Sequence, residues 1–143
     1  MKISTRGHYG VLAMTVLARH YGGDPISIKE IAEEKNLSAS YLEQLLAPLR
    51  RAGLVRSVRG PRGGYHLASV PENITVGDVL EVLEGPFVPV ECAGTDEALP
   101  CCDDDCSLRR VWQDLRDSML QVVDSVTLKE LAEDVGSRVA SVE

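Results

Sequence analysis

The sequence has few aromatic residues and no long apolar run. It contains one Trp and one Phe in 143 residues, so aliphatic side chains have to build the core, and a hydrophobic content of 44% is sufficient for one. No apolar stretch approaches the roughly 20 residues that a membrane-spanning helix needs. The opening stretch MKISTRGHYG does not resemble a secretory signal. We therefore expect a globular, cytoplasmic protein that makes no use of a membrane.

The sequence also lacks the motifs of the common enzyme classes. It contains no glycine-rich phosphate-binding loop, no nucleophile elbow, and no acid–base pair that is tied to a cleft. Paired CxxC motifs and the histidine spacing of a zinc finger are absent as well. The sequence therefore predicts that the protein is not an enzyme.

Two short helices joined by a turn are predicted after Ser27. Ser27 and Glu30 have the spacing of a capping box, which begins a helix, and turn-forming residues interrupt the helical pattern at 36–38. Ser40 and Glu43 suggest a second capping box, although Pro48 should bend or loosen the helix that follows. This second helix has an apolar stripe that consists of Leu42, Leu45, Leu46 and Leu49.

The other face of the second helix is polar, as expected of a recognition helix in a helix-turn-helix motif. The major groove of DNA is about 12 Å wide and admits a helix, on which Gln44 can pair with adenine and Glu43 can accept a hydrogen bond from a cytosine amino group. The candidate DNA-contact residues of this helix are Ser38, Ser40, Tyr41, Glu43 and Gln44.

A hairpin is predicted directly after the second helix. Residues 54–58 and 65–67 alternate like two strands, and the glycine-rich segment 59–64 joins them. Arg59 and Arg62 lie at the tip, where they can reach a phosphate or enter the minor groove. A hairpin in this place is typical of a winged helix, although an ordinary solvated hairpin with two arginines is the alternative.

Charge is divided unevenly along the chain. The formal net charge is -7, but residues 1–70 hold 10 Lys and Arg against 5 Asp and Glu, a balance of +5. Residues 71–143 hold 5 against 17, a balance of -12. The predicted DNA-reading motif therefore lies in the basic half, and screening over roughly 8 Å limits the effect of distant acids.

A long amphipathic helix is predicted after residue 106, since apolar residues recur there at helical spacing from Leu108 to Val126. At 1.5 Å per residue such a helix is roughly 28 Å long. A two-fold partner would cover so long a stripe, and paired DNA half-sites about 34 Å apart favour a homodimer. The alternative is that this helix packs against the first helix of its own chain.

All four cysteines lie in one proline-containing stretch, with the pattern Cys92-x8-Cys101-Cys102-x3-Cys106. Thiolates on such a loop can ligate an iron–sulfur cluster, whose ligand spacing is less regular than that of zinc. Either of the adjacent cysteines could instead form a redox pair with Cys92 or Cys106. The pattern leaves a metal site and a redox thiol pair open.

Several segments together resemble the Rrf2 family of bacterial transcription regulators. They are MKISTRGHYG, YLEQLLAPLRRAGLVRSVRGPRGGY, ITVGDVLEVLEGP and VWQDLRD, and the resemblance covers nearly the whole chain. Within the family the sequence is most similar to the iron–sulfur regulators of the IscR type, which are winged-helix homodimers that control cluster-assembly genes. The resemblance implies DNA contacts at the recognition-helix positions named above and at Arg59.

The resemblance also implies cluster ligands at Cys92, at one of Cys101 and Cys102, and at Cys106. The family pattern expects a histidine shortly after the third cysteine, but this chain has Arg109 there, and arginine is an implausible ligand. The fourth ligand then comes from the second adjacent cysteine, from a carboxylate of the loop, or from His8 of the partner subunit. The cluster type is open, with 2Fe-2S favoured over 4Fe-4S.

We therefore predict a mainly α fold with a small β-hairpin wing. Residues 1–86 form the winged helix-turn-helix domain, 87–106 the cysteine-bearing loop, and 107–143 the dimerisation helix and tail. The predicted function is a homodimeric repressor that binds a double-stranded operator, regulates iron–sulfur cluster assembly genes, and receives its cluster from assembly proteins. The alternatives are a cluster-free thiol, redox or cysteine-metabolism sensor, a nitric-oxide sensor, and a protein-interaction adaptor.

Overall fold

The computed structural model describes residues 3–89 and 107–134. Its elements in chain order are α1 (Thr5–Arg19), α2 (Ile28–Lys35), α3 (Ala39–Arg51), β1 (Val55–Val58), β2 (Gly64–Leu67), the 3-10 turn η1 (Pro71–Asn73), α4 (Val76–Glu84) and α5 (Ser107–Ser125). A further helical segment occupies 128–134. The described residues thus form six α-helices and one antiparallel hairpin, which confirms the predicted fold class.

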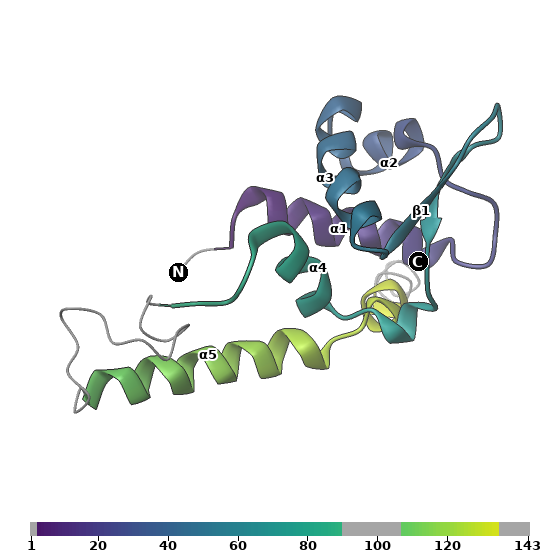
Figure 1. Cartoon of the computed structure of the whole chain (residues 1–143). Helices are drawn as coiled ribbons and strands as arrows, with labels where there is room; N and C mark the ends of the chain where they lie inside the picture. The colour runs from purple at the N-terminus through teal and green to yellow at the C-terminus, as the bar shows by residue number, and fades with distance from the viewer. Residues whose placement is uncertain (1–2, 90–106, 135–143) are drawn as a thin grey trace, which may run out of the picture.

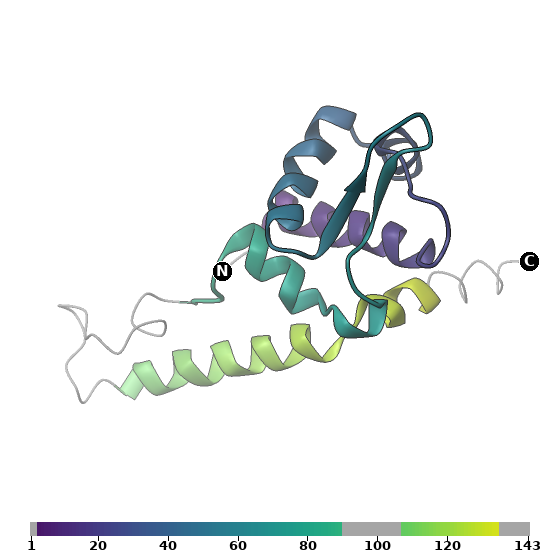
Figure 2. The ribbon, with the colours of Figure 1, turned by 45° about the vertical axis from the view of Figure 1, so that its right-hand side comes forward.

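The elements are arranged around α1, which lies beneath α2, α3 and the hairpin (Figure 1). α4 packs against α1, and α5 runs below α4 and extends away from the rest of the molecule, as Figure 2 also shows. The described part of the chain has no helix that is long and apolar enough to cross a membrane. The hairpin and α3 therefore lie at one end of the molecule, and α5 lies at the other.

α1 is the central helix of the core. One of its faces is buried, and a glycine on another face lets α4 approach closely. The Ser4 side chain caps its start by accepting a hydrogen bond from Gly7 N at 3.3 Å. Val16 and Leu17 are buried in the core. A Cβ atom on Gly10 would lie only 2.0 Å from Leu83 Cδ1, so a glycine here lets α4 approach α1 closely.

α4 begins at a capping box formed by Thr75 and Asp78. The Thr75 hydroxyl accepts from Asp78 N at 3.1 Å, and the Asp78 carboxylate accepts from Thr75 N at 3.0 Å. This reciprocal pair fixes the direction of α4 against α1.

The segment after α5 returns to the winged domain. Val76 N donates to Val126 O and Leu128 N donates to Ile74 O, each at 2.9 Å. Thr127 caps the following helical turn by accepting from Glu130 N at 3.2 Å. Leu128 has no exposed surface and belongs to the main core cluster. The chain therefore leaves the winged domain in α5 and comes back to it.

Candidate nucleic-acid interface

The helix-turn-helix consists of α2 and α3, and side-chain caps define both helix starts. Ser27 N donates to the Glu30 carboxylate at 2.8 Å while Glu30 N donates to Ser27 Oγ at 3.2 Å, which confirms the predicted capping box. α2 ends at Asn36, which adopts the left-handed conformation with φ 54°. The turn between the helices is therefore short and fixed at both sides.

The start of α3 differs from the prediction by two residues. Ser38, not Ser40, is the cap, because its Oγ accepts a hydrogen bond from Tyr41 N at 3.1 Å. The Ser40 side chain is thereby on the exposed surface of the first turn and has no capping task. α3 runs without interruption through Pro48, whose carbonyl accepts from Ala52 N at 3.0 Å, so the proline does not end the helix.

The two faces of α3 have the predicted character. The four leucines of the stripe, Leu42, Leu45, Leu46 and Leu49, are at most 1% exposed. Ser40, Glu43 and Gln44 are exposed on the opposite side. Of the remaining candidates, Ser38 is exposed but engaged as the cap, and Tyr41 is half-buried.

Tyr41 is held by an aromatic contact that the sequence does not predict. Its ring packs edge-to-face on Tyr9 of α1, with centroids 6.3 Å apart, and Tyr9 packs in the same way on His8 at 5.3 Å. Such pairs contribute about 0.5–1.5 kcal/mol beyond area burial. The first turn of α3 is therefore oriented by α1, although nothing in the local pattern of either helix indicates this pairing.

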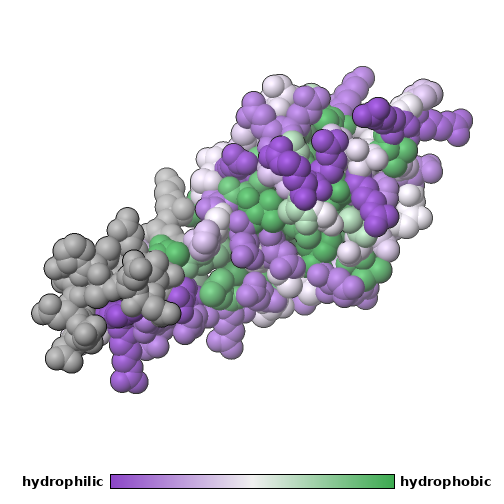
Figure 3. All heavy atoms as spheres, in the orientation of Figure 1, coloured by the Kyte–Doolittle hydropathy of each residue, from purple (hydrophilic) through white to green (hydrophobic). Residues whose placement is uncertain are grey.

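The wing pairs Val55 with Leu67 at its base and Val58 with Gly64 near its tip. Val55 and Leu67 are buried, whereas Arg59 and Arg62 are exposed in the loop between the strands. Gly60 has φ 115°, a conformation that favours glycine, so the loop can turn tightly there. Hydrophilic side chains project from this end of the molecule in Figure 3.

A short bridge holds the wing to the helix-turn-helix. Ile26 N donates to Tyr65 O at 2.9 Å, and Tyr65 N donates to Ile26 O at 2.7 Å. Since Ile26 directly precedes the cap of α2, the wing and α2 are fixed relative to each other. A Cβ atom on Gly64 would lie 2.4 Å from Ile26 O, so this approach requires glycine.

Most arginines of this end are available to an anion. Arg19 forms an ion pair with Glu34, but no ion pair with another described residue occupies Arg50, Arg51, Arg56, Arg59 or Arg62. Hydrogen bonds from Ser27 lower the pKa of the Glu30 carboxyl and hold its side chain at the start of α2, and Glu30 forms no ion pair with these arginines. The exposed surface of α3 and the wing therefore combines polar side chains with arginines that pair with no described carboxylate.

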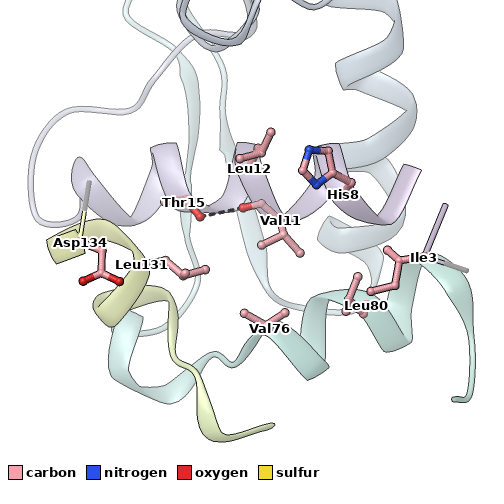
Figure 4. Close-up of a pocket in the computed structure, with 9 residues that line it drawn as sticks. All are labelled: Ile3, His8, Val11, Leu12, Thr15, Val76, Leu80, Leu131 and Asp134. Atoms are coloured by element: carbon pink, nitrogen blue, oxygen red, sulfur yellow. Dashed lines mark hydrogen bonds between the residues drawn. The ribbon is translucent and has the colours of Figure 1, made fainter. Parts of the chain in front are cut away.

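The predicted metal-binding residues are only partly within the described chain. Cys92, Cys101, Cys102 and Cys106 lie outside it. No group of three or more His, Cys, Asp or Glu side chains in 3–89 and 107–134 could hold a metal ion. His8 is exposed on α1 beside an apolar cavity of about 380 Å³, which α1, α4 and the segment 128–134 line (Figure 4).

Comparisons with known proteins agree with this geometry. The model of the Rrf2 family, described as iron-dependent transcriptional regulators, matches residues 3–134. The chain is 49% identical over 132 residues to the regulator CymR of Bacillus subtilis strain 168, covering 92% of this chain and 90% of that protein. The solved structure of CymR, the global cysteine regulator of B. subtilis, has a TM-score of 0.80 and covers 93% of this chain and 97% of CymR.

Regulators of the IscR type are also similar to this chain. The structure of T. potens IscR is 45% identical with a TM-score of 0.76, covering 94% of this chain and 88% of that one. IscR of Vibrio campbellii is 36% identical over 134 residues, covering 94% of this chain and 79% of that protein.

These findings confirm the predicted family but do not specifically support the predicted IscR subtype, because CymR has the higher identity. The relatives are transcriptional regulators and not enzymes, in agreement with the prediction from the sequence. The chain has a winged helix-turn-helix in which the exposed surface of α3 and the wing is polar and cationic. The family model matches residues 3–134. The chain belongs to the Rrf2 family of DNA-binding transcriptional regulators.

Proposed function

We propose that this protein is a homodimeric repressor that places α3 in the major groove of its operator and the wing in the adjacent minor groove. The observation that carries this proposal is the polar first turn of α3, exposed beside a wing whose arginines have no ion pair with a described residue. Base contacts come from the α3 side chains and backbone contacts from the wing. The residues proposed to contact DNA are Ser38, Ser40, Tyr41, Glu43, Gln44, Arg59 and Arg62.

The exposed stripe of α5 supports the dimer. No residue of α5 is buried within the part of the chain that the structure describes. Leu108, Val111, Leu115 and Val122 are 56%, 52%, 43% and 65% exposed. A helix with such a stripe is stable in water when a second apolar surface covers it, and a second α5 from another copy supplies one. The dimer then presents two copies of α3 to two half-sites.

The four cysteines are the proposed sensor. Cys92, one of Cys101 and Cys102, and Cys106 would hold an iron–sulfur cluster of the 2Fe-2S type, with His8 of the partner subunit as a candidate fourth ligand. The likeness to T. potens IscR supports this version. Control of cluster-assembly genes, with assembly proteins as cluster donors, belongs to the same proposal.

The likeness to CymR supports a second candidate function. CymR of B. subtilis is described as the global cysteine regulator of that organism, and a structure of Staphylococcus aureus CymR in an oxidized form is 46% identical to this chain. On this proposal the same cysteines act as a cluster-free sensor of cysteine supply or thiol oxidation. The two candidates share the operator-binding surface and differ only in the chemistry at the cysteines.

The operator-binding proposal is tested by selecting duplexes from a random library with the purified protein. We expect a two-fold symmetric consensus with half-sites one helical turn apart, and binding that weakens as salt increases. Failure to select any sequence, together with no salt-sensitive binding, would contradict the proposal and favour a protein-interaction adaptor.

The sensor proposals are separated by one anaerobic preparation. Visible absorption with bound iron and sulfide supports the cluster, and the absorption should disappear in Cys92→Ala and Cys106→Ala proteins. A colourless protein with an oxidisable thiol supports the cluster-free sensor. Operator affinity is then measured before and after loss of the cluster or oxidation of the thiol, and equal affinity in both states would contradict both versions.

A further inference from the structure

A hollow of about 380 Å³ lies where the end of α3, the start of α2 and the wing meet. Arg50, in the last turn of α3, lines it together with Ser57 and Arg59 of the wing. Ser27, the cap of α2, lines it as well. None of the described residues that line this hollow is acidic.

The wing contributes Ser57, Val58 and Arg59 to the lining of this hollow. Arg56, one position before Ser57 in β1, is exposed and does not line the hollow. The hairpin therefore has one arginine at the hollow and one of equal charge that does not line it.

The positive charge in the hollow has no ion-pair partner among the described residues. Neither Arg50 nor Arg59 forms an ion pair with any residue in 3–89 or 107–134. The nearby capping carboxylate of Glu30 accepts from Ser27 N at 2.8 Å, which holds it at the first turn of α2. Two guanidinium groups and the Ser57 hydroxyl are therefore available to an anion, and guanidinium is well suited to phosphate.

DNA geometry indicates which anion this is. If α3 occupies the major groove and the wing reaches the adjacent minor groove, the phosphate ridge between those grooves has to cross the space between α3 and the wing. We propose that this hollow seats that ridge and that Arg50 is a phosphate-contact residue, with Ser57 beside it. The inference rests on the proposed operator binding and adds a contact that orients the protein without reading a base.

Arg50→Ala and the charge-matched control Arg56→Ala test this proposal on the selected operator and on an unrelated duplex. Each lost phosphate contact lowers the slope of log affinity against log salt by about 0.9, so Arg50→Ala should lower it by about 1.8 in a dimer. Raising the salt concentration from about 50 mM to 200 mM should therefore reduce the ratio of wild-type to Arg50→Ala affinity about 12-fold. Arg56→Ala should leave the slope closer to that of the wild type, and both duplexes should show the same change.

Single methylphosphonate substitutions in the operator identify the phosphate. Neutralising the phosphate that Arg50 contacts should weaken the wild type and Arg56→Ala, but should cost Arg50→Ala nothing further. Arg50→Gln, which keeps a long side chain, should behave like Arg50→Ala, and the melting curve of each variant checks that it is folded.

An unchanged salt slope for folded Arg50→Ala and Arg50→Gln would overturn the proposal, as would equal losses for wild type and variant at every neutralised phosphate. Either result leaves operator binding through α3 intact. Failure of operator binding is recognised separately, because the wild-type protein would then select no duplex sequence.

Discussion

Helices α3 and α5 carry the same kind of apolar stripe, but different surfaces cover it. The four leucines of α3 are at most 1% exposed, because α1 and α4 of the same chain pack on them. On α5 the apolar residues Leu108, Val111, Leu115 and Val122 remain 43% to 65% exposed, although the helix contacts α4. Helical periodicity therefore identifies an apolar face, whereas the connections of the chain determine what covers it.

The two halves of the chain also differ in charge. This charge difference separates the same two elements, α3 and α5. The basic half contains α3 and the wing, and the acidic half contains α5. Figure 1 shows these elements at opposite ends of the molecule. Because screening weakens interactions beyond roughly 8 Å at physiological salt, the acidic end does little to reduce attraction of DNA to the basic end.

The largest expected effect comes from disrupting the proposed dimer contact that covers the apolar stripe of α5. Leu115→Glu places a carboxylate in the exposed stripe and should give monomers at micromolar concentration, measured by sedimentation. Loss of the second half-site should reduce operator affinity by about 10²- to 10⁴-fold.

Gln121→Glu is the matched control, since it adds the same charge at an exposed position outside the apolar stripe. It should sediment as the wild type and retain operator binding. Wild-type protein that sediments as a monomer at the same concentration would contradict the dimer.

The next prediction concerns the segment that follows α5, residues 128–134, which packs into the core of the same chain. Leu128 has no exposed surface, so Leu128→Ala should lower the free energy of unfolding by about 2–5 kcal/mol in a denaturant titration. Glu130→Ala, at an exposed neighbouring position, should change it by no more than about 0.5 kcal/mol. Equal effects of the two substitutions would mean that 128–134 does not stabilise the winged domain.

The sequence was sufficient to predict features that depend on local spacing. The box at Ser27 with Glu30 forms as predicted, because it joins residues three positions apart. The start of α3 was wrong by two residues, since Ser38 and Ser40 have the same side chain and only the backbone conformation decides which one caps. The continuous path of α3 through Pro48 was likewise not predictable, because leucines buried against other helices stabilise it.

Contacts between distant segments could not be predicted from a single sequence. Tyr9 and Tyr41, Ile26 and Tyr65, and Leu128 with the core each depend on how the elements pack. The arginines of the wing were identified because a glycine-rich turn marks its tip. Arg50 was not identified, since its relation to the wing arises only when α3 and the hairpin are placed side by side.

A smaller effect distinguishes base reading from backbone binding within the basic half. Gln44→Ala should reduce discrimination at one or two base positions by about 1–3 kcal/mol, because it removes a hydrogen-bonding side chain from the exposed face of α3. Arg59→Ala should instead weaken minor-groove or phosphate binding. Competition with single-base operator variants measures both, and an equal loss for Gln44→Ala on every duplex would refute its role in recognition.

The smallest effect concerns the capping box that begins α2. Hydrogen bonds from the Ser27 backbone, and then from its side chain, lower the pKa of the Glu30 carboxyl below its ordinary value of 4.5. A lowered folded-state pKa means that this contribution to stability is complete above pH 4.5 and is lost as the pH falls through the folded-state value. An NMR titration should give a pKa for Glu30 below 4.5 in the wild type and a value closer to 4.5 in Ser27→Ala. Operator binding near pH 7 should not depend on this titration, because Glu30 is ionised there in both proteins. An unchanged Glu30 pKa in Ser27→Ala would show that the Ser27 hydroxyl does not help to hold the carboxylate, since the backbone N–H of residue 27 remains in that variant.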